Sequence, residues 1–206
     1  MDIKPMTAGN LDDAVSLLTT SFQDRPFYTY IAPNPAERRS FLIANFNQRI
    51  TQGLGVNEID LALIDGKLVG IAVWLPPPAA HEADAISHTA ADHALEELLR
   101  AYSTGVQERF LAFIKTLIQA REQTIQQPFW SLAPIAVLPT ARGKGVASAL
   151  ITKKLKEIDE SSLPCFLATQ DKENIAIYEK FAFQVQRKDP VSSIITHYTM
   201  IRPANR

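Results

Sequence analysis

The stretch from residue 129 to residue 158 constrains the fold most, because an apolar run there leads through a glycine turn directly into an amphipathic helix. A helix N-terminus offers backbone N–H groups without intrahelical partners and carries about half a positive charge. Gly143 and Gly145 remove the Cβ atoms that would hold an anion away from these groups. This order of strand, turn and helix predicts a cradle for a diphosphate. A relaxed turn that binds nothing has the same local pattern.

Hydrophobic periodicity predicts alternating strands and helices along the rest of the chain. A hairpin is expected over residues 59–75, where Asp65-Gly66 forms a strong tight-turn pair. The aromatic-rich residues 24–30 break the helical pattern. Other strands are expected at 3–6, 129–138, 165–169, 183–186 and 194–201, and helices at 11–22, 34–50, 145–158, 174–181 and in two pieces within 79–127. Hairpins and crossover helices together indicate an α/β fold with a mixed sheet.

Polar residues mark several of the expected helix starts. Asn10 and Asn34 each precede an apolar-periodic segment and are predicted to be N-caps. Thr104 and Gln107 have capping-box spacing. Gly105 is expected to separate the two helical pieces of the region 79–127.

Length and composition limit the classes of protein to which this chain can belong. At 206 residues, a single domain or a domain with an inserted element is expected. The net charge of −1 gives no indication of a nucleic-acid-binding or membrane-binding surface. The single Cys165 allows no intrachain disulfide, and residues 1–5 lack the basic start and apolar core of a signal peptide, so a cytoplasmic protein is expected. Pro76, Pro77 and Pro78 interrupt an apolar run that is too short to span a membrane.

Several other kinds of site are disfavoured by spacing. A P-loop needs Ser or Thr after the lysine, but Lys144 is followed by Gly145; a dinucleotide fingerprint needs a third glycine where Ser148 stands. A zinc-protease helix starting at His81 would need its second histidine at Ala85, and His88 and His93 do not share a helix face. No metal is therefore expected. Cys165 lies in an apolar strand, where an inert thiol is the usual outcome.

The glycine turn gains meaning from its neighbours. The strand at 129–138, the spacing Arg142-x-x-Gly145-x-Ala147, the following helix, the strand at 165–169 and Asn174-x-x-x-Tyr178 occur in one order. In this order the chain resembles the GNAT superfamily of N-acetyltransferases, most clearly over residues 129–185 and more loosely over residues 3–75. The resemblance implies a single domain over residues 1–206, with a mixed, mostly antiparallel, twisted sheet of six to seven strands flanked by helices. Residues 79–127 would be a helical insertion.

The same resemblance implies where acetyl-CoA, the co-substrate of the family, would bind. Asn174 would contact its arm, and Tyr178 would stand near its sulfur as general acid, although a tyrosine packed on the core is the alternative. The strand carrying the pantetheine contacts would splay from the strand at 165–169. The pantetheine would pair with Ile135, Ala136 and Val137, and the pyrophosphate would bind the amides of Arg142, Gly143, Lys144, Gly145, Val146 and Ala147, with the hydroxyl of Ser148 nearby.

Two positions depart from the pattern of the family. The family often has glycine where Ala182 stands before Phe183. Pro134 removes a backbone donor from the pantetheine strand, which is compatible with a bulge and leaves the register of Ile135 to Val137 open by one residue.

The general base is less evident. By position in the family, Glu58 and Asp60 are candidates that would act through water, whereas solvated carboxylates at a strand end are the alternative. His197 could face the acceptor, or could be an edge-strand histidine without a catalytic role. A cluster of three aromatic residues could line an acceptor pocket or pack over the sheet: Phe27, Tyr28 and Tyr30.

The resemblance implies an enzyme that moves an acetyl group from acetyl-CoA to a primary amine of a small molecule or peptide by direct transfer. A non-catalytic acyl-CoA-binding sensor or scaffold is the alternative, and a nucleotide-phosphate binder follows only if the turn motif is coincidental. The expected partners are acetyl-CoA and an amine acceptor of open identity, without nucleic acid or membrane. A homodimer is allowed but not indicated.

Overall fold

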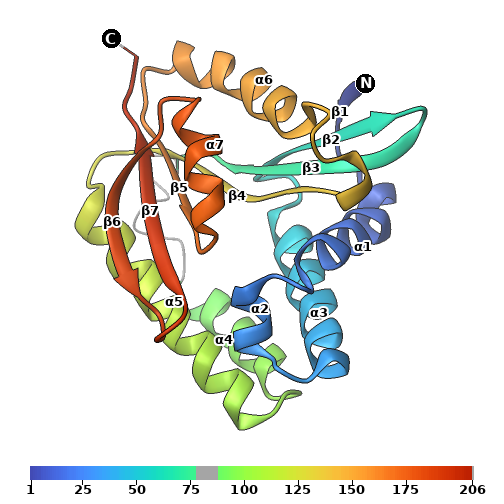
Figure 1. The fold of residues 1–206 in the computed structure, drawn as a ribbon, viewed down its shortest axis with the longest axis vertical. Coiled ribbons are helices and arrows are strands. Elements are labelled where there is room, and N and C mark those ends of the chain that lie inside the picture. Colours follow the sequence, from blue (N-terminus) through green and yellow to red (C-terminus); the bar gives the residue numbers. More distant parts are fainter. Residues whose placement is uncertain (78–87, 206) are drawn as a thin grey trace.

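The computed structural model describes residues 1–77 and 88–205, with side chains described from residue 93 onward in the second range. Its seven-stranded sheet has the strand order β1-β2-β3-β4-β5-β7-β6 (Figure 1). Neighbouring strands run antiparallel except for β4 and β5, which are parallel. The bounds are β1 (Asp2–Pro5), β2 (Glu58–Ile64), β3 (Lys67–Leu75), β4 (Trp130–Val137), β5 (Cys165–Thr169), β6 (Gln184–Pro190) and β7 (Thr196–Arg202). The predicted mixed, mostly antiparallel sheet is confirmed.

Helices cover both faces of this sheet. Figure 1 shows α6 along one side of β2–β4, with α1 and α3 on the other. On the far half of the sheet, α5 packs against β6 and β7. The bounds are α1 (Leu11–Phe22), α2 (Pro26–Ile31), α3 (Pro35–Gly53), α4 (His88–Leu99), α5 (Thr104–Thr124), α6 (Val146–Glu160) and α7 (Ile175–Glu179). Within the described ranges, no helix is long and apolar enough to cross a membrane.

Local sequence signals explain several of these elements. The side chain of Asn34 accepts hydrogen bonds from the N–H groups of Ala36 and Glu37, as predicted for the N-cap of α3. Asp65 and Gly66 have positive φ angles of 51° and 73°, which suits a tight two-residue turn between β2 and β3. The predicted hairpin is therefore confirmed.

Residues 24–30 were expected to interrupt the helical pattern, but they contain most of α2. Pro26 is the first residue of this helix, a position where its missing N–H costs nothing. Phe27 and Ile31 are buried against α3 and α5. The prediction was wrong because tertiary burial stabilises a helix whose aromatic and β-branched residues have little helical preference of their own.

Two predicted helix starts also differ in detail. Ser103 is the N-cap of α5, and its N–H donates to the carboxylate of Glu37 at 2.7 Å. Thr104 is therefore already helical, and the chain breaks between α4 and α5 at residues 100–103 instead of at Gly105. The side chain of Asn10 accepts from the N–H of Thr7 and does not cap α1.

The parallel pair β4 and β5 separates along its length. Trp130, Ser131 and Leu132 pair with the first three residues of β5, and no strand pairing between the two continues beyond them. On its other side β4 stays paired with β3, where Ile135 lies opposite Ala72 and Leu132 lies opposite Trp74. This register places one extra residue on β4, so the bulge expected around Pro134 is present. The splayed strands leave the second half of β4 with one free edge.

Candidate functional site

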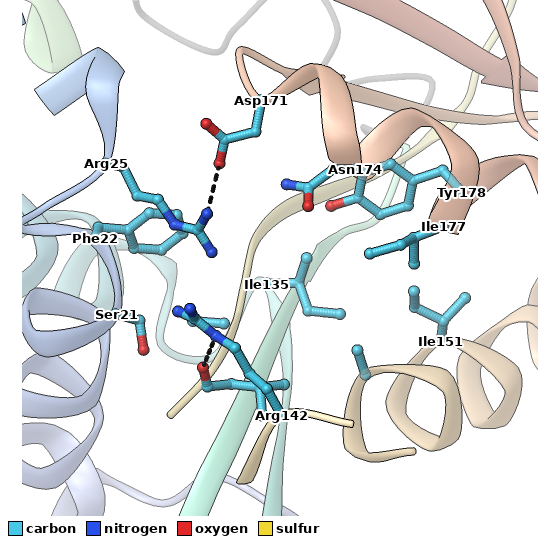
Figure 2. A pocket seen from close by; sticks show the side chains of 13 residues that line it. Ser21, Phe22, Arg25, Ile135, Arg142, Ile151, Asp171, Asn174, Ile177 and Tyr178 are labelled. Carbon is cyan, nitrogen blue, oxygen red and sulfur yellow. Dashed lines mark hydrogen bonds and ion pairs between the residues drawn. The ribbon is translucent and has the colours of Figure 1, made fainter. Parts of the chain in front are cut away.

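A cavity of about 160 Å³ lies where β4 and β5 diverge (Figure 2). The second half of β4 forms one wall, α7 and the segment before it form another, and the ends of α1 and α6 complete the lining. The structure brings together seven of the residues predicted to form a site: Ile135, Ala136, Val137, Arg142, Ala147, Asn174 and Tyr178.

The β4 wall presents an unpaired backbone edge. Ile135 and Ala136 pair with Ala72 and Ile71 of β3 on one side, and no strand within residues 1–77 and 88–205 pairs with their other side. The carbonyl oxygen of Val137 accepts a long hydrogen bond from Nε of Arg142, at 3.4 Å. An open strand edge of this kind recognises an extended amide-containing ligand through main-chain hydrogen bonds.

The glycine turn lies at the end of the cavity where α6 begins. Gly143 and Gly145 have φ angles of 75° and 77°, in the left-handed region that favours glycine. A Cβ built on either glycine meets no atom within 4 Å, so the backbone of the turn is uncovered. The first N–H groups of α6 have no intrahelical partners. The turn therefore has the bare backbone donors and the helix polarity that a diphosphate requires.

The other residues predicted around the turn differ in what their side chains can reach. Val146 is buried and approaches Gly70 of β3, so only its amide is available. Ala147 lines the cavity. Lys144 and Ser148 are exposed at the surface beside the turn and do not line the cavity.

Tyr178 combines the two roles that the sequence left open. Its side chain is 8% exposed and packs edge-on against Phe183, yet it also lines the cavity. Burial raises the pKa of Tyr178 to about 12, and the negative charge of Asp171 adds to the effect. The phenol is consequently neutral and able to donate a proton at neutral pH. Asn174 points into the cavity beside it (Figure 2).

The two predicted base residues lie elsewhere, under the middle of α6. Nζ of Lys153 donates to Oδ1 of Asp60 at 2.7 Å, and Nζ of Lys154 donates to Glu58. Asp60 is only 5% exposed, so it is not the solvated carboxylate that the sequence also allowed. Neither carboxylate lines the cavity. The structure does not bring Glu58 or Asp60 to Tyr178.

Lys154 explains why Glu58 is held away from the cavity. Its side chain is buried, and its Nζ lies 4.4 Å from the centre of the Trp130 ring. Burial alone would lower the pKa of Lys154, but hydrogen bonds to Glu157 and Glu58 outweigh it and raise that pKa. The lysine is therefore charged, and it needs the carboxylates as partners.

His197 is buried inside the sheet and not at its edge. The strand β7 lies between β5 and β6, so the expectation of an edge-strand histidine was wrong. Nδ1 of His197 lies 2.9 Å from Nε2 of Gln170, and its ring packs against Phe113. Burial lowers the pKa of His197 to about 4, which keeps the imidazole neutral at neutral pH. The ring does not line the cavity.

The aromatic cluster of the α2 region packs instead of forming a pocket. Phe27 packs on Phe113 with tilted rings whose centres are 4.4 Å apart, and Tyr28 meets Phe22 edge-on at 5.6 Å. Tyr30 lies under the guanidinium of Arg109. None of these three predicted residues (Phe27, Tyr28 and Tyr30) lines the cavity.

The remaining reactive residues are distant from the site or lie outside the described parts. Cys165 is fully buried, and burial raises the pKa of its thiol to about 12. His81 lies outside the described residues, as does the side chain of His88, while His93 is exposed. Among the side chains that the structure describes, no three His, Cys, Asp or Glu residues form a metal-binding group.

Sequence reasoning missed almost half of the cavity lining. These residues come from the end of α1 and the turn after it, from α6, from the segment after β5 and from α7: Ser21, Phe22, Arg25, Ile151, Asp171 and Ile177. Nη1 of Arg25 lies 3.4 Å from Oδ2 of Asp171. The available signal for Asp171 was a carboxylate just after a predicted strand, the position where ligand-binding side chains gather in α/β proteins.

The family model and the similar solved structures both point to acetyltransferases. The sequence model of the Acetyltransferase (GNAT) family matches residues 18–183. A Corynebacterium glutamicum structure described as histone acetyltransferase HPA2 and related acetyltransferase has a TM-score of 0.70 and 21% identity, covering 99% of this chain and 96% of that chain. Drosophila melanogaster polyamine N-acetyltransferase has a TM-score of 0.64 and 13% identity, covering 97% and 98%. PaiA N-acetyltransferase from Thermoplasma acidophilum, in complex with coenzyme A, has a TM-score of 0.59 and 11% identity, covering 98% and 99%. At these identities the three structures share the fold with this chain.

Proposed function

The chain belongs to the acetyltransferase (GNAT) family, whose members transfer an acetyl group from acetyl-CoA to amines, and we propose how its cavity performs this transfer. The acceptor would be a primary amine of a small molecule or peptide, which attacks the thioester directly. One observation carries the proposal. The free edge of β4, the buried Tyr178 and the two residues that flank the bare glycines, Arg142 and Ala147, line a single cavity at the point where β4 leaves β5.

Each part of the cavity suits one part of acetyl-CoA. The amides of residues 142–147 would hold the diphosphate, with the charge of Arg142 at the rim. The edge of β4 at Ile135–Val137 would pair with the pantetheine amides as a further strand. Asn174 would contact the same arm. Acetyl-CoA itself supplies the activated acetyl group as a thioester.

Two groups of the chain would then assist the transfer. A backbone N–H on the free edge of β4 would polarise the thioester carbonyl, an interaction worth about 3 kcal/mol in other acyl-transfer sites. Tyr178 would donate its proton to the sulfur as the carbon–sulfur bond breaks and the carbon–nitrogen bond forms. Because burial raises the pKa of Tyr178 above that of a thiol, near ~8.5, the phenol still carries its proton when the thiolate departs. The proton lost by the amine balances the one that the phenol gives.

Glu58 and Asp60 fit a base role poorly because lysines of α6 hold both carboxylates outside the cavity. A path through water would have to cross from the α6 side of β2 to the free edge of β4. We therefore propose a structural role for both residues, and the acceptor amine would enter the cavity already neutral or lose its proton to solvent.

The remaining features of the chain fit this function. We infer a single domain over residues 1–206, in which α5, a part of the region 79–127, flanks the acceptor side, because it contacts β6, β7 and α2. The expected partners are acetyl-CoA and an amine, because a net charge of −1 favours neither nucleic acid nor an anionic membrane. The buried, unpaired Cys165 fits a reducing cytoplasm.

Two measurements test the proposal in sequence. Acetyl-CoA at one hundred times its dissociation constant should stabilise the protein by about 2.7 kcal/mol in thermal unfolding, and no shift at saturation would refute binding. Thiol release during incubation with primary amines then tests transfer. A thermal shift combined with no thiol release from any amine would favour the alternative of a non-catalytic acyl-CoA sensor.

A further inference from the structure

The ion pair of Arg25 and Asp171 lies inside the cavity, and the transfer chemistry described above does not use it. Arg25 comes from the turn between α1 and α2, and Asp171 comes from the segment after β5. Figure 2 shows the two side chains pointing toward each other across the cavity, with Asn174 and Tyr178 beside Asp171. Two opposite charges are thus placed next to the reacting groups.

Rigid turns hold both residues in place. The N–H of Asp171 donates to Oγ1 of Thr169 at 3.2 Å, and its carbonyl accepts from the N–H of Asn174 at 3.0 Å. The N–H of Arg25 donates to the carbonyl of Phe22 at 3.0 Å, and its own carbonyl accepts from Thr29. Main-chain anchoring of this kind fixes the backbone positions from which both side chains extend into the cavity.

The pair itself is incomplete. Its single contact of 3.4 Å is longer than the ~2.7–2.9 Å of a strong charge-assisted hydrogen bond. By contrast, Arg202 binds both oxygens of Asp159, at 2.5 and 2.9 Å. The other guanidinium donors of Arg25 have no hydrogen-bond partner among the described residues, and the side chains of Arg25 and Asp171 are 32% and 20% exposed. Both groups therefore retain hydrogen-bonding capacity for a ligand.

The charges of the cavity indicate what such a ligand would carry. Arg142 borders the turn where the diphosphate would bind, so the phosphates would balance its charge. Arg25 and Asp171 then remain as one positive and one negative group. A polyamine would bring additional positive charge toward Arg25, whereas an amine with a neighbouring carboxylate matches both groups. Two charge-assisted interactions would replace one long contact.

We propose that Arg25 and Asp171 form the acceptor subsite, and that the preferred acceptor is an amino acid or a similar amine with an adjacent carboxylate. Arg25 would bind the carboxylate, and Asp171 would bind the amino group beside the thioester. This inference rests on the proposed transfer function and names its substrate class. It contrasts with the polyamine acetyltransferase that shares the fold, at 13% identity.

Matched acceptor pairs test the proposal on the unmodified enzyme. Each amino acid is compared with the amine that lacks its carboxylate, for example arginine with agmatine and lysine with cadaverine, by thiol release with acetyl-CoA. The carboxylate should raise kcat/KM at least about tenfold, because one hydrogen bond to a charged group has this effect. Equal kcat/KM values within every pair would overturn the subsite, and so would the absence of reaction with every amino acid.

Variants assign the effect to the pair. Arg25→Met should raise KM for the amino acid about 10- to 100-fold and leave KM for the matched amine within about twofold. Arg25→Lys should recover part of the loss because it restores the charge. Asp171→Asn should weaken both acceptors. Arg187→Met and Asp189→Asn are the matched controls, since that ion pair lies outside the cavity with side-chain exposures of 35% and 19%.

A phosphate of acetyl-CoA is the other anion that Arg25 could meet. If Arg25 binds it, Arg25→Met should weaken acetyl-CoA binding about tenfold without changing the acceptor preference, and this result would overturn the inference. The thermal shift by acetyl-CoA distinguishes failure of the acceptor subsite from failure of the proposed transfer function. A normal shift without carboxylate preference refutes the subsite alone, whereas no shift refutes the transfer function. The comparison of acceptors on the unmodified enzyme remains decisive if a variant does not fold.

Discussion

The N-terminal end and the second half of α6 differ in whether their polar groups are already bound within the protein. At its N-terminal end, Gly145 and Ala147 leave a bare backbone beside an open cavity. In its second half, Lys153 and Lys154 bind the carboxylates of β2 and close the packing over Trp130. One end exposes unsatisfied donors, and the other satisfies every charge that it brings toward the sheet. The difference teaches that a carboxylate near a predicted site can act on a ligand only if no other side chain of the protein already binds it.

The first prediction breaks the N-terminal end of α6. Gly145→Glu should weaken acetyl-CoA binding more than about 100-fold, because a negative side chain would enter the diphosphate site. Binding is measured by titration calorimetry. The positive φ also imposes a backbone cost of about 1–2 kcal/mol. Gly55→Glu is the matched control, since Gly55 has a φ of 82° and open space around it but lies far along the chain from the turn. Unchanged affinity in the Gly145 variant would show that the turn does not hold the diphosphate.

The second prediction concerns the proton donor that faces the cavity. Tyr178→Phe should lower kcat about 100-fold, the usual scale for a lost general acid, and leave KM for acetyl-CoA within about twofold. The hydroxyl of Tyr102, a half-buried tyrosine outside the cavity, serves as the control in Tyr102→Phe. Steady-state thiol release measures both variants. An unaffected kcat in Tyr178→Phe would remove the proposed acid role.

The third prediction concerns the second half of α6, where Lys153 and Lys154 bind the carboxylates of β2. Asp60→Asn and Glu58→Gln should keep kcat within about twofold, because neither carboxylate reaches the cavity. Asp60→Asn should also lower the free energy of unfolding by about 1 kcal/mol, since Lys153 loses its partner but stays partly hydrated. Urea unfolding and thiol release test the two effects separately. A loss of kcat near 100-fold with normal stability would restore the base assignment.

The smallest predicted effect is the pH dependence of stability that comes from Lys154 and Glu157 of α6. The hydrogen bond from Lys154 lowers the pKa of Glu157 from its ordinary value of 4.5, so its contribution is present above pH 4.5 and is lost as the pH falls through the lowered pKa. The pKa of Lys154 is raised above 10.5, so its contribution is lost as the pH rises through that pKa. Because the carboxylates of Glu58 and Glu157 are half exposed, their pairs with the buried Lys154 contribute about 0–1 kcal/mol, which is at most ~2–4 °C in Tm.

Lys154→Met is the variant that tests this pH dependence, because methionine can keep the packing on Trp130 while Glu58 and Glu157 stay hydrated. Its Tm should change less than that of the unmodified protein between neutral pH and pH values below about 4.5. Lys156→Met provides the control for removing a lysine from the exposed side of α6. A parallel fall in Tm for both proteins would show that the lysine cluster does not carry the acid sensitivity.

Much of the fold follows from short-range patterns. The apolar run, the paired glycines and the periodic helix after them predicted β4, the turn and α6, because strand, turn and helix preferences there all agree. Asp65-Gly66 predicted the hairpin for the same reason. The helix α2 was missed, since residues such as Phe27 and Ile31 favour strands and become helical only through burial against α3 and α5.

The candidate site divides in a similar way. Residues close to the glycine turn or within Asn174-x-x-x-Tyr178 could be predicted, because their spacing lies within one or two adjacent elements. Arg25 and Asp171 could not be paired from the sequence, since they meet only after α1 and β5 are placed around β4. The pairing of Lys153 with Asp60 was hidden for the same reason, and it reversed the interpretation of Asp60 as a base candidate.

The sequence by itself determined the family, the succession of strand, glycine turn and helix, and the backbone that would hold acetyl-CoA. These depend on local geometry: glycines that allow positive φ, a helix N-terminus that follows at once, and alternating apolar residues. Only the tertiary structure decided which charges remain available. Lysines from α6 neutralise Glu58 and Asp60, while Arg25 and Asp171 keep free hydrogen-bonding groups inside the cavity. Ionic contacts join residues far apart in the chain, and their availability depends on packing that no local pattern records.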